Sequence, residues 1–161
     1  MKIWIVHDSK SGNGKSLAET LGEVFRQKAD VGIEHIKKVT PQKVANDRPD
    51  LIVVGTAIRA FSSSFASKIW IRGLKKQLRK ANHIIPLGVV FVTHAMPKKM
   101  VEFWGKRFHN ILDSGIAIAE VYPGWLSGRV KDTEGPLEEG TTEKFAHIAK
   151  QILENVIKTN K

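Results

Sequence analysis

HDSKSGNGKS, residues 7–16, directly follows the apolar run at residues 3–6 (IWIV) and directly precedes a segment with helical periodicity. The loop is rich in Ser, Gly and Asn, so it offers hydroxyl groups and unhindered backbone N–H groups. The following helix would direct the positive end of its dipole at the loop. This arrangement predicts an anion site between strand and helix, and a phosphate group fits its chemistry.

Two nucleotide-binding motifs match this loop only in part. The phosphate loop of nucleotide hydrolases, G-x-x-x-x-G-K-[ST], would need a glycine where Ser9 stands. That class also needs an acidic residue after a later strand to hold magnesium, whereas the later apolar runs end in Thr56 and in Thr93 followed by His94. The dinucleotide pattern G-x-G-x-x-G has Leu17 in place of its third glycine. A plain turn that caps the helix is the remaining alternative.

The rest of the chain alternates between strand and helix patterns. Mostly continuous apolar runs at residues 3–6, 51–54, 87–92 and 116–121 are typical of strands buried on both faces of a parallel sheet. Residues 31–36 alternate with polar residues, which predicts an exposed edge strand. The order of the elements therefore predicts an α/β fold, an open sheet with helices on both faces.

Helical spacing predicts which side chains enter the core. These are Leu17, Leu21, Val24 and Phe25; Phe65, Ile69 and Leu74; Met100, Val101, Trp104, Phe108, Ile111 and Leu112; and a C-terminal stripe from Phe145 to Ile157 that begins after TTEK at 141–144. Trp70 is also expected in the core. Residues 123–140 read as a long irregular loop, long enough to suggest a functional role.

Composition sets further limits. A chain of 161 residues with no Cys predicts one domain spanning residues 1–161, without disulfides or thiolate metal sites, and suits the reducing cytoplasm. The histidines show no metal-ligand spacing, so no metal is expected. No apolar stretch approaches the length of a membrane span. The net charge of +10 favours acidic partners, but the Lys and Arg residues are spread over many segments of the chain, so we expect a well-solvated basic surface and no nucleic-acid site.

Within this setting, Ser9-Lys10-Ser11-Gly12-Asn13-Gly14 resembles the phosphate loop of the flavodoxin family, a T/S-x-T/S-G-N-T pattern after the first strand. The resemblance continues through DLIVVGTAIR at 50–59 and the fourth strand. The stretch from Gly55 to Arg59, followed by Phe61, is similar to the G-x-S/T-I-R sequence of flavodoxin-type protoporphyrinogen oxidases. Gly14 stands where the family usually has Thr, and the loop after the fourth strand lacks the Tyr that often stacks on the ring.

The resemblance implies a flavodoxin-like three-layer sandwich, with five parallel strands in the order 2-1-3-4-5. It also implies non-covalent FMN, with its phosphate in the first loop and its ring between the loops after strands three and four. The cofactor-binding candidates are Ser9, Lys10, Ser11, Gly12, Asn13, Gly14, Thr56, Ala57, Ile58, Arg59, Phe61, Thr93, His94 and Ala95. Met96 is a further ring contact by position, and Trp125 is an outside candidate.

Four residues near the expected ligand have competing interpretations. Arg59 would stabilise negative charge on a reduced flavin, or form an ion pair with Asp8 or Glu120. His94 would donate a hydrogen bond to the ring, or pack as an ordinary residue at a strand end. Lys10 and Lys15 would neutralise the phosphate, or remain solvated.

These expectations lead to an FMN-binding protein that acts in electron transfer between redox protein partners of acidic character. The alternative is an FMN-dependent oxidoreductase acting on a quinone, porphyrinogen or nicotinamide. Two further alternatives are a flavin-less binding domain and a P-loop nucleotide hydrolase. No catalytic residue is identified, because no Ser-His-Asp or paired-carboxylate pattern is present.

Overall fold

The computed structural model describes residues 1–59, 62–132 and 134–159. Within them the strands are β1 (Lys2–His7), β2 (Asp30–His35), β3 (Leu51–Arg59), β4 (Ser62–Ser63), β5 (Ile85–His94), β6 (Ile118–Val121) and β7 (Leu126–Arg129). The helices are α1 (Asn13–Phe25), α2 (Pro41–Asn46), α3 (Phe65–Lys80), α4 (Lys98–Asp113) and α5 (Thr141–Thr159). Each predicted strand and helix is present, so the alternation inferred from hydrophobic periodicity is confirmed.

The sheet has the order β2-β1-β3-β5-β6, and these neighbouring strands are parallel. The predicted five-strand order is therefore confirmed, with β2 at the edge. β1 and β3 are aligned so that His7 lies opposite Gly55, and β3 and β5 so that Ala57 lies opposite Thr93. This register brings the carboxyl ends of the three central strands to one edge of the sheet.

The fifth strand position is divided between two strands. β6 pairs with the first part of β5, and β7 pairs with its last part, from Phe91 to His94. The prediction of an irregular loop over residues 123–140 was therefore wrong for residues 126–129. β7 is the sequence LSGR, whose single strongly apolar residue, Leu126, is too weak a signal for a buried strand.

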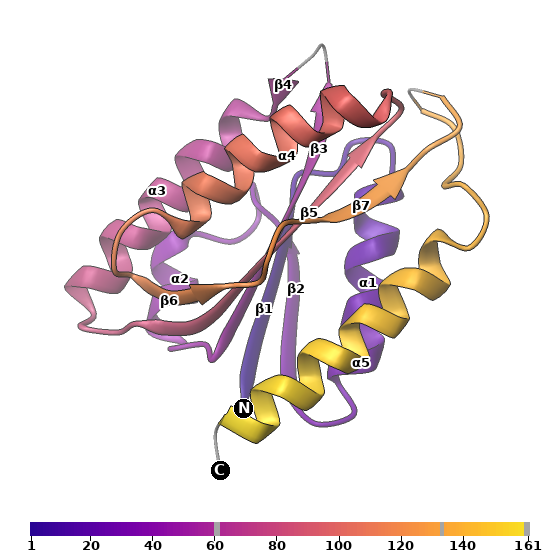
Figure 1. The fold of residues 1–161 in the computed structure, drawn as a ribbon. Coiled ribbons are helices and arrows are strands. Elements are labelled where there is room, and N and C mark those ends of the chain that lie inside the picture. The colour runs from indigo at the N-terminus through magenta and orange to yellow at the C-terminus, as the bar shows by residue number, and fades with distance from the viewer. Residues whose placement is uncertain (60–61, 133, 160–161) are drawn as a thin grey trace.

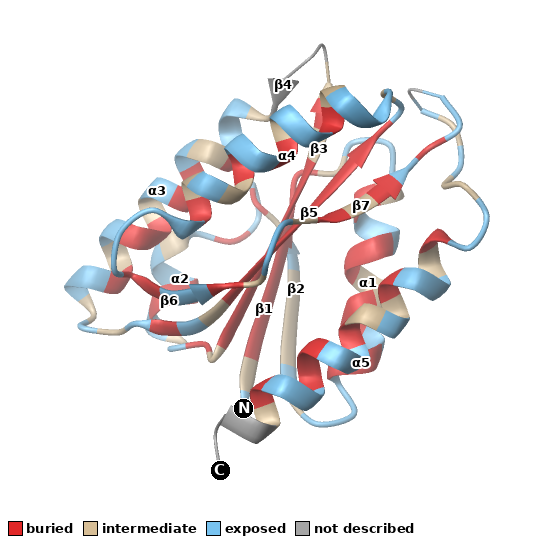
Figure 2. Ribbon diagram, in the orientation of Figure 1, coloured by how far each residue is buried: buried red, intermediate tan, exposed pale blue. Residues whose placement is uncertain are grey.

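Helices cover both faces of the sheet (Figure 1). On one face α2, α3 and α4 enclose a core cluster that includes Trp70, Leu74 and Phe108. On the other face α1 and α5 enclose a second cluster that includes Leu17, Phe91 and Phe145. Figure 2 shows buried residues along the central strands β1, β3 and β5 and on the inward sides of the helices. Over the described residues, every helix is too short or too polar to span a lipid bilayer.

The core face of α3 differs from the prediction. Leu74 is buried, but Phe65 and Ile69 are 70% and 51% exposed. The buried face instead includes Trp70, Ile71, Leu74 and Leu78, whose spacing follows the 3.6-residue period more closely than 65, 69 and 74 do. Phe65 and Ile69 therefore lie on the surface.

The basic residues, which fall in many segments of the sequence, are distributed unevenly between the two faces of the sheet. α3 and α4 carry ten of the 26 Lys and Arg residues of the chain and only two of its 16 acidic residues. α1 and α5 carry four basic and four acidic residues. Because α3 and α4 pack on the same face of the sheet, most of the net charge of +10 is gathered on that face.

Candidate functional site

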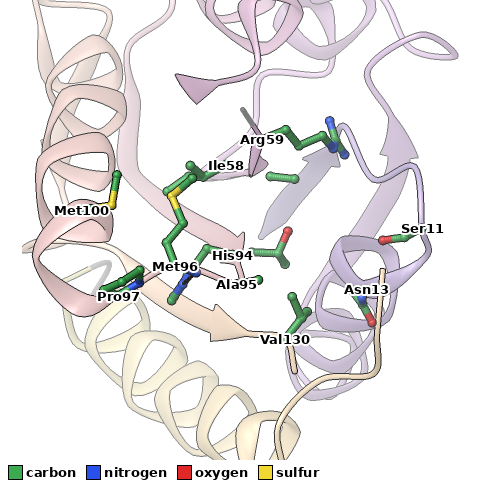
Figure 3. A pocket seen from close by; sticks show the side chains of 12 residues that line it. Ser11, Asn13, Ile58, Arg59, His94, Ala95, Met96, Pro97, Met100 and Val130 are labelled. Atoms are coloured by element: carbon green, nitrogen blue, oxygen red, sulfur yellow. Dashed lines mark hydrogen bonds between the residues drawn. The ribbon is translucent and has the colours of Figure 1, made fainter. Parts of the chain in front are cut away.

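A pocket of about 370 Å³ lies at the carboxyl edge of the sheet (Figure 3). The loop after β1, the end of β3 and the segment after β5 all contribute to its walls. It is lined by Ser11, Asn13, Ala57, Ile58, Arg59, Thr93, His94, Ala95, Met96, Pro97, Met100 and Val130. Ligands of open α/β sheets bind at this edge, where the connections on either side of β1 run in opposite directions.

The two sides of the pocket differ in chemistry. Ser11 and Asn13 lie on one side, at the start of α1, and Met96, Pro97 and Met100 lie across from them at the start of α4 (Figure 3). Arg59 reaches in from the end of β3. The pocket therefore offers polar groups at one end, an apolar wall at the other and one cation, which suits an elongated ligand with an anionic end and a flat apolar body.

The loop after β1 is shaped around the start of α1. Gly12 has a φ of +96°, a left-handed conformation that favours glycine, and its N–H donates to Ser9 Oγ at 3.1 Å. The backbone N–H groups of Asn13, Gly14 and Lys15 belong to the first turn of α1, where no carbonyl group within the helix can accept from them. These donors, the helix dipole and the Ser11 hydroxyl form a donor set suited to a phosphate.

Gly14, which stands where the flavodoxin pattern usually has Thr, is closely packed against Ser9. A Cβ atom at position 14 would lie 3.2 Å from Ser9 Cβ, which is tighter than usual for such a contact. Asn13 is fixed from the other side, because its Nδ2 donates to the Gly135 carbonyl at 2.8 Å. The segment after β7 is thereby held against the loop.

Asp8 organises the edge of the sheet, and the sequence analysis assigned it only as a possible partner of Arg59. Its carboxylate is buried, at 5% exposure, and accepts hydrogen bonds from Thr56 Oγ1 at 2.8 Å, Ser67 Oγ at 2.8 Å and the Ala57 N–H at 3.0 Å. These three donors come from β3 and α3. Asp8 thus fixes the first loop to the end of β3 and to α3.

Both interpretations of Arg59 fit its position. Its Nη2 lies 3.9 Å from Asp8 Oδ1 and donates to the Asp8 carbonyl at 3.2 Å, while the side chain also lines the pocket. The ion-pair partner is therefore Asp8 and not Glu120. Because the Asp8 carboxylate offsets part of the guanidinium charge, Arg59 acts on the pocket as a partly compensated cation.

His94 is a buried residue with both ring nitrogens engaged. Nδ1 accepts from the Met96 N–H at 3.4 Å, so the proton lies on Nε2, which donates to Ser127 Oγ at 2.7 Å. Burial lowers the pKa of His94 below its ordinary value of 6.5, and the ring is neutral at pH 7. His94 therefore ties the segment after β5 to β7, which favours the packed interpretation over a hydrogen bond to a ligand.

The structure places the fourteen predicted cofactor-binding residues in different surroundings. Eight of them line the pocket: Ser11, Asn13, Ala57, Ile58, Arg59, Thr93, His94 and Ala95. Ser9, Lys10 and Gly12 instead line a separate pocket of about 460 Å³ on the β2 side of the loop, together with Lys15 and His35. Thr56 and Gly14 are buried. Phe61 lies outside the described residues.

The pocket contains residues that the sequence analysis missed. Met96 lines it as expected by position, whereas Pro97, Met100 and Val130 were not predicted. Met100 was assigned to the core of its helix, and Val130 follows the unrecognised strand β7. Trp125 lines a neighbouring pocket of about 580 Å³, which shares His94 and Met96 with the first.

Comparison with known proteins defines the fold. No protein-family model matches the sequence, and no curated protein matches it significantly. Solved structures do match over nearly the whole chain.

Oxidised flavodoxin 2 from Bacillus cereus is 18% identical with a TM-score of 0.72, and the match covers 96% of this chain and 99% of that one. A flavodoxin from the domain Archaea is 16% identical with a TM-score of 0.63, covering 97% and 99%. A flavodoxin, WrbA-like protein from Agrobacterium tumefaciens is 12% identical with a TM-score of 0.69, covering 98% of each chain. The chain therefore has the flavodoxin-like fold, as the resemblance implied.

Proposed function

We propose that the pocket at the carboxyl edge of the sheet binds FMN and that the protein acts in electron transfer. The observation that carries this proposal is the meeting, in one pocket, of polar groups at the start of α1, the Arg59 cation and the apolar segment from Met96 to Met100. An aromatic ring joined to a phosphate matches these three features. The flavodoxins among the structural neighbours support the same cofactor.

Separate parts of the chain would hold the two ends of FMN. The Ser11 hydroxyl and the first backbone N–H groups of α1 would bind the phosphate, and Lys10 and Lys15 would lower the local negative potential. Residues 57–59 and 93–96 would enclose the ring. When bound, FMN would supply the redox chemistry, and the protein would supply the binding groups and the local charge.

The surrounding residues would control the environment of the ring. Arg59 would favour added negative charge, to the extent that Asp8 leaves its guanidinium uncompensated. Met96 and Met100 would exclude water from the apolar side of the pocket. His94, neutral and bonded to Ser127, would keep the 94–96 segment rigid without adding charge.

Titration with FMN and with riboflavin, followed by quenching of flavin fluorescence, tests this proposal. Riboflavin lacks the phosphate, so we expect FMN to bind at least about 100-fold more tightly, since two charge-assisted hydrogen bonds are worth that much. Ser11→Ala should weaken FMN binding about ten-fold, the loss of one charge-assisted hydrogen bond, and leave riboflavin unchanged. Ser16→Ala, an exposed position on the same helix, should change neither.

Two results would contradict the proposal. Absence of any spectral change with FMN would leave a flavin-less binding domain. Equal affinity for FMN and riboflavin would show that the first loop does not hold the phosphate.

The neighbouring pocket favours a second candidate function, an FMN-dependent oxidoreductase. At about 580 Å³, it shares His94 and Met96 with the first pocket, and Trp125 offers an aromatic surface for a quinone, porphyrinogen or nicotinamide. Steady-state turnover with these three substrate classes distinguishes the two functions. An enzyme would turn over one class and lose the activity in Trp125→Leu, whereas a carrier would turn over none.

A further inference from the structure

The face formed by α3 and α4 carries most of the net positive charge of the protein. The two helices hold ten basic and two acidic residues, while α1 and α5 on the opposite face hold four of each. A protein with charge gathered on one face attracts and orients an oppositely charged surface. An evenly solvated basic protein would show no such division.

Among the described residues, the cations of α3 and α4 form no ion pair. Each ion pair found among the described residues lies outside α3 and α4. Burial lowers the pKa of Lys68, and the positive charges of Arg107 and Arg72 lower that pKa further. Like charges held together without compensation are unfavourable in the free protein, and an acidic surface placed over them would relieve the repulsion.

Aromatic side chains hold some of these cations in place. The Arg107 guanidinium lies 5.6 Å from the centre of the Phe103 ring and 5.3 Å from that of Trp104, and Lys68 Nζ lies 5.9 Å from Trp104. Stacking of this kind orders a guanidinium before it meets a carboxylate, so less entropy is lost on binding.

Large apolar side chains project from the same face. Phe65 is 70% exposed, Phe103 56% and Ile69 51%, and they are half of the six exposed large hydrophobic residues described in the structure. We call the surface formed by Phe65, Lys68, Ile69, Arg72, Phe103 and Arg107 the basic face. Its mixture of exposed aromatic residues and arginine is typical of the anchor residues of protein–protein interfaces.

We propose that the basic face is the docking surface for an acidic electron-transfer protein. This inference rests on the proposed function for the identity of the partner as a redox protein. The basic face borders the candidate site, because Met100 lines the pocket and Phe103 lies one turn further along α4. A partner bound there would lie beside the pocket.

Binding of an acidic plant-type [2Fe–2S] ferredoxin, measured by isothermal titration calorimetry, tests the proposal. We expect binding at 25 mM NaCl that weakens about ten-fold or more at 150 mM, as for a charge-steered contact. The double variant Lys68→Glu with Arg107→Glu should weaken binding at least about ten-fold, and Phe103→Ser about five-fold, as expected for anchor residues. The matched control, Lys28→Glu with Lys150→Glu, changes the net charge equally at exposed positions elsewhere and should weaken binding less than about three-fold.

Three outcomes overturn the inference. The first is an equal loss of binding in the control variant, and the second is no ferredoxin binding at 25 mM NaCl. The third is co-sedimentation with phosphatidylcholine–phosphatidylglycerol vesicles in place of ferredoxin binding, which would assign the basic face to an anionic membrane. Repeating the measurement with and without added FMN separates this inference from the proposed function. If FMN fails to bind but ferredoxin binding still depends on Lys68 and Arg107, the flavin proposal fails and the docking surface stands.

Discussion

Replacing Asp8 tests whether one buried carboxylate holds the edge of the sheet together. Asp8→Ala would remove the acceptor for Thr56 Oγ1, Ser67 Oγ and the Ala57 N–H. Each donor left unsatisfied in a buried site costs about 1–3 kcal/mol, and the hydroxyl groups can turn toward other acceptors more readily than the fixed backbone N–H. We therefore expect Asp8→Ala to lower the free energy of unfolding by about 4 kcal/mol.

Asp8→Asn provides a graded comparison. Its amide oxygen can still accept from the Ala57 N–H, and its NH₂ group can donate to the hydroxyl oxygens of Thr56 and Ser67 after those hydroxyls rotate. The Arg59 guanidinium, 3.9 Å from the carboxylate, would lose its ion pair but keep its hydrogen bond to the Asp8 carbonyl. We expect a loss of about 1–2 kcal/mol, clearly smaller than that of Asp8→Ala.

Urea unfolding followed by tryptophan fluorescence and far-UV circular dichroism measures these differences. Asp30→Ala is the control, because Asp30 is an exposed acid whose ion pair with Lys2 should contribute less than about 1 kcal/mol. If Asp8→Ala costs no more than Asp30→Ala, or if the Asn and Ala variants of Asp8 are equally stable, then the hydrogen bonds to Asp8 do not hold the loop, and our account of the site is wrong.

Three further predictions concern pH, redox potential and packing. Burial lowers the pKa of Lys75 to about 8 from an ordinary 10.5, so between these pH values the unfolded chain binds more protons than the folded protein. The free energy of unfolding of the wild type, relative to that of Lys75→Met, should therefore rise by about 3 kcal/mol from pH 8 to 10.5. Urea unfolding measures this difference, and a difference that does not change with pH would contradict the lowered pKa. Arg59→Ala should make bound flavin harder to reduce by about 1 kcal/mol, which lowers the midpoint potential by roughly 20 mV for a two-electron couple. An unchanged midpoint potential would show that Arg59 has no electrostatic effect on the flavin and acts only through its contact with Asp8. Leu74→Ala should lower the free energy of unfolding by about 2–5 kcal/mol and Phe65→Ala by less than about 0.5 kcal/mol in the same assay, because only Leu74 is buried. A larger loss for Phe65→Ala than for Leu74→Ala would contradict the packing of α3 described above.

The sheet and the general place of the pocket could be predicted because both depend on local sequence patterns. Continuous apolar runs mark buried parallel strands, and parallel strands place their carboxyl ends at one edge. Eight predicted residues line the pocket: those of the first loop were expected from its Ser, Gly and Asn content, and those after β3 and β5 from the resemblance to flavodoxins. The predictions that failed concerned weak or ambiguous patterns, as for β7 with its single strongly apolar residue and for α3 with two possible apolar faces.

The role of Asp8 and the charge of the basic face could not be predicted for a different reason. Both depend on which distant segments meet in space: Ser67 lies 59 residues after Asp8, and Lys68 meets Arg107 only because α3 and α4 pack on the same face of the sheet. Hydrophobic periodicity records which side of an element faces the core, but it does not record which neighbour lies beside it. The sequence alone therefore does not show that Asp8 has three hydrogen-bond donors around it. Nor does it show that the basic residues of α3 and α4 lack ion-pair partners among the described residues. The features that most sharply separate a carrier from an enzyme, namely the basic face and the second pocket beside His94, belong to this group.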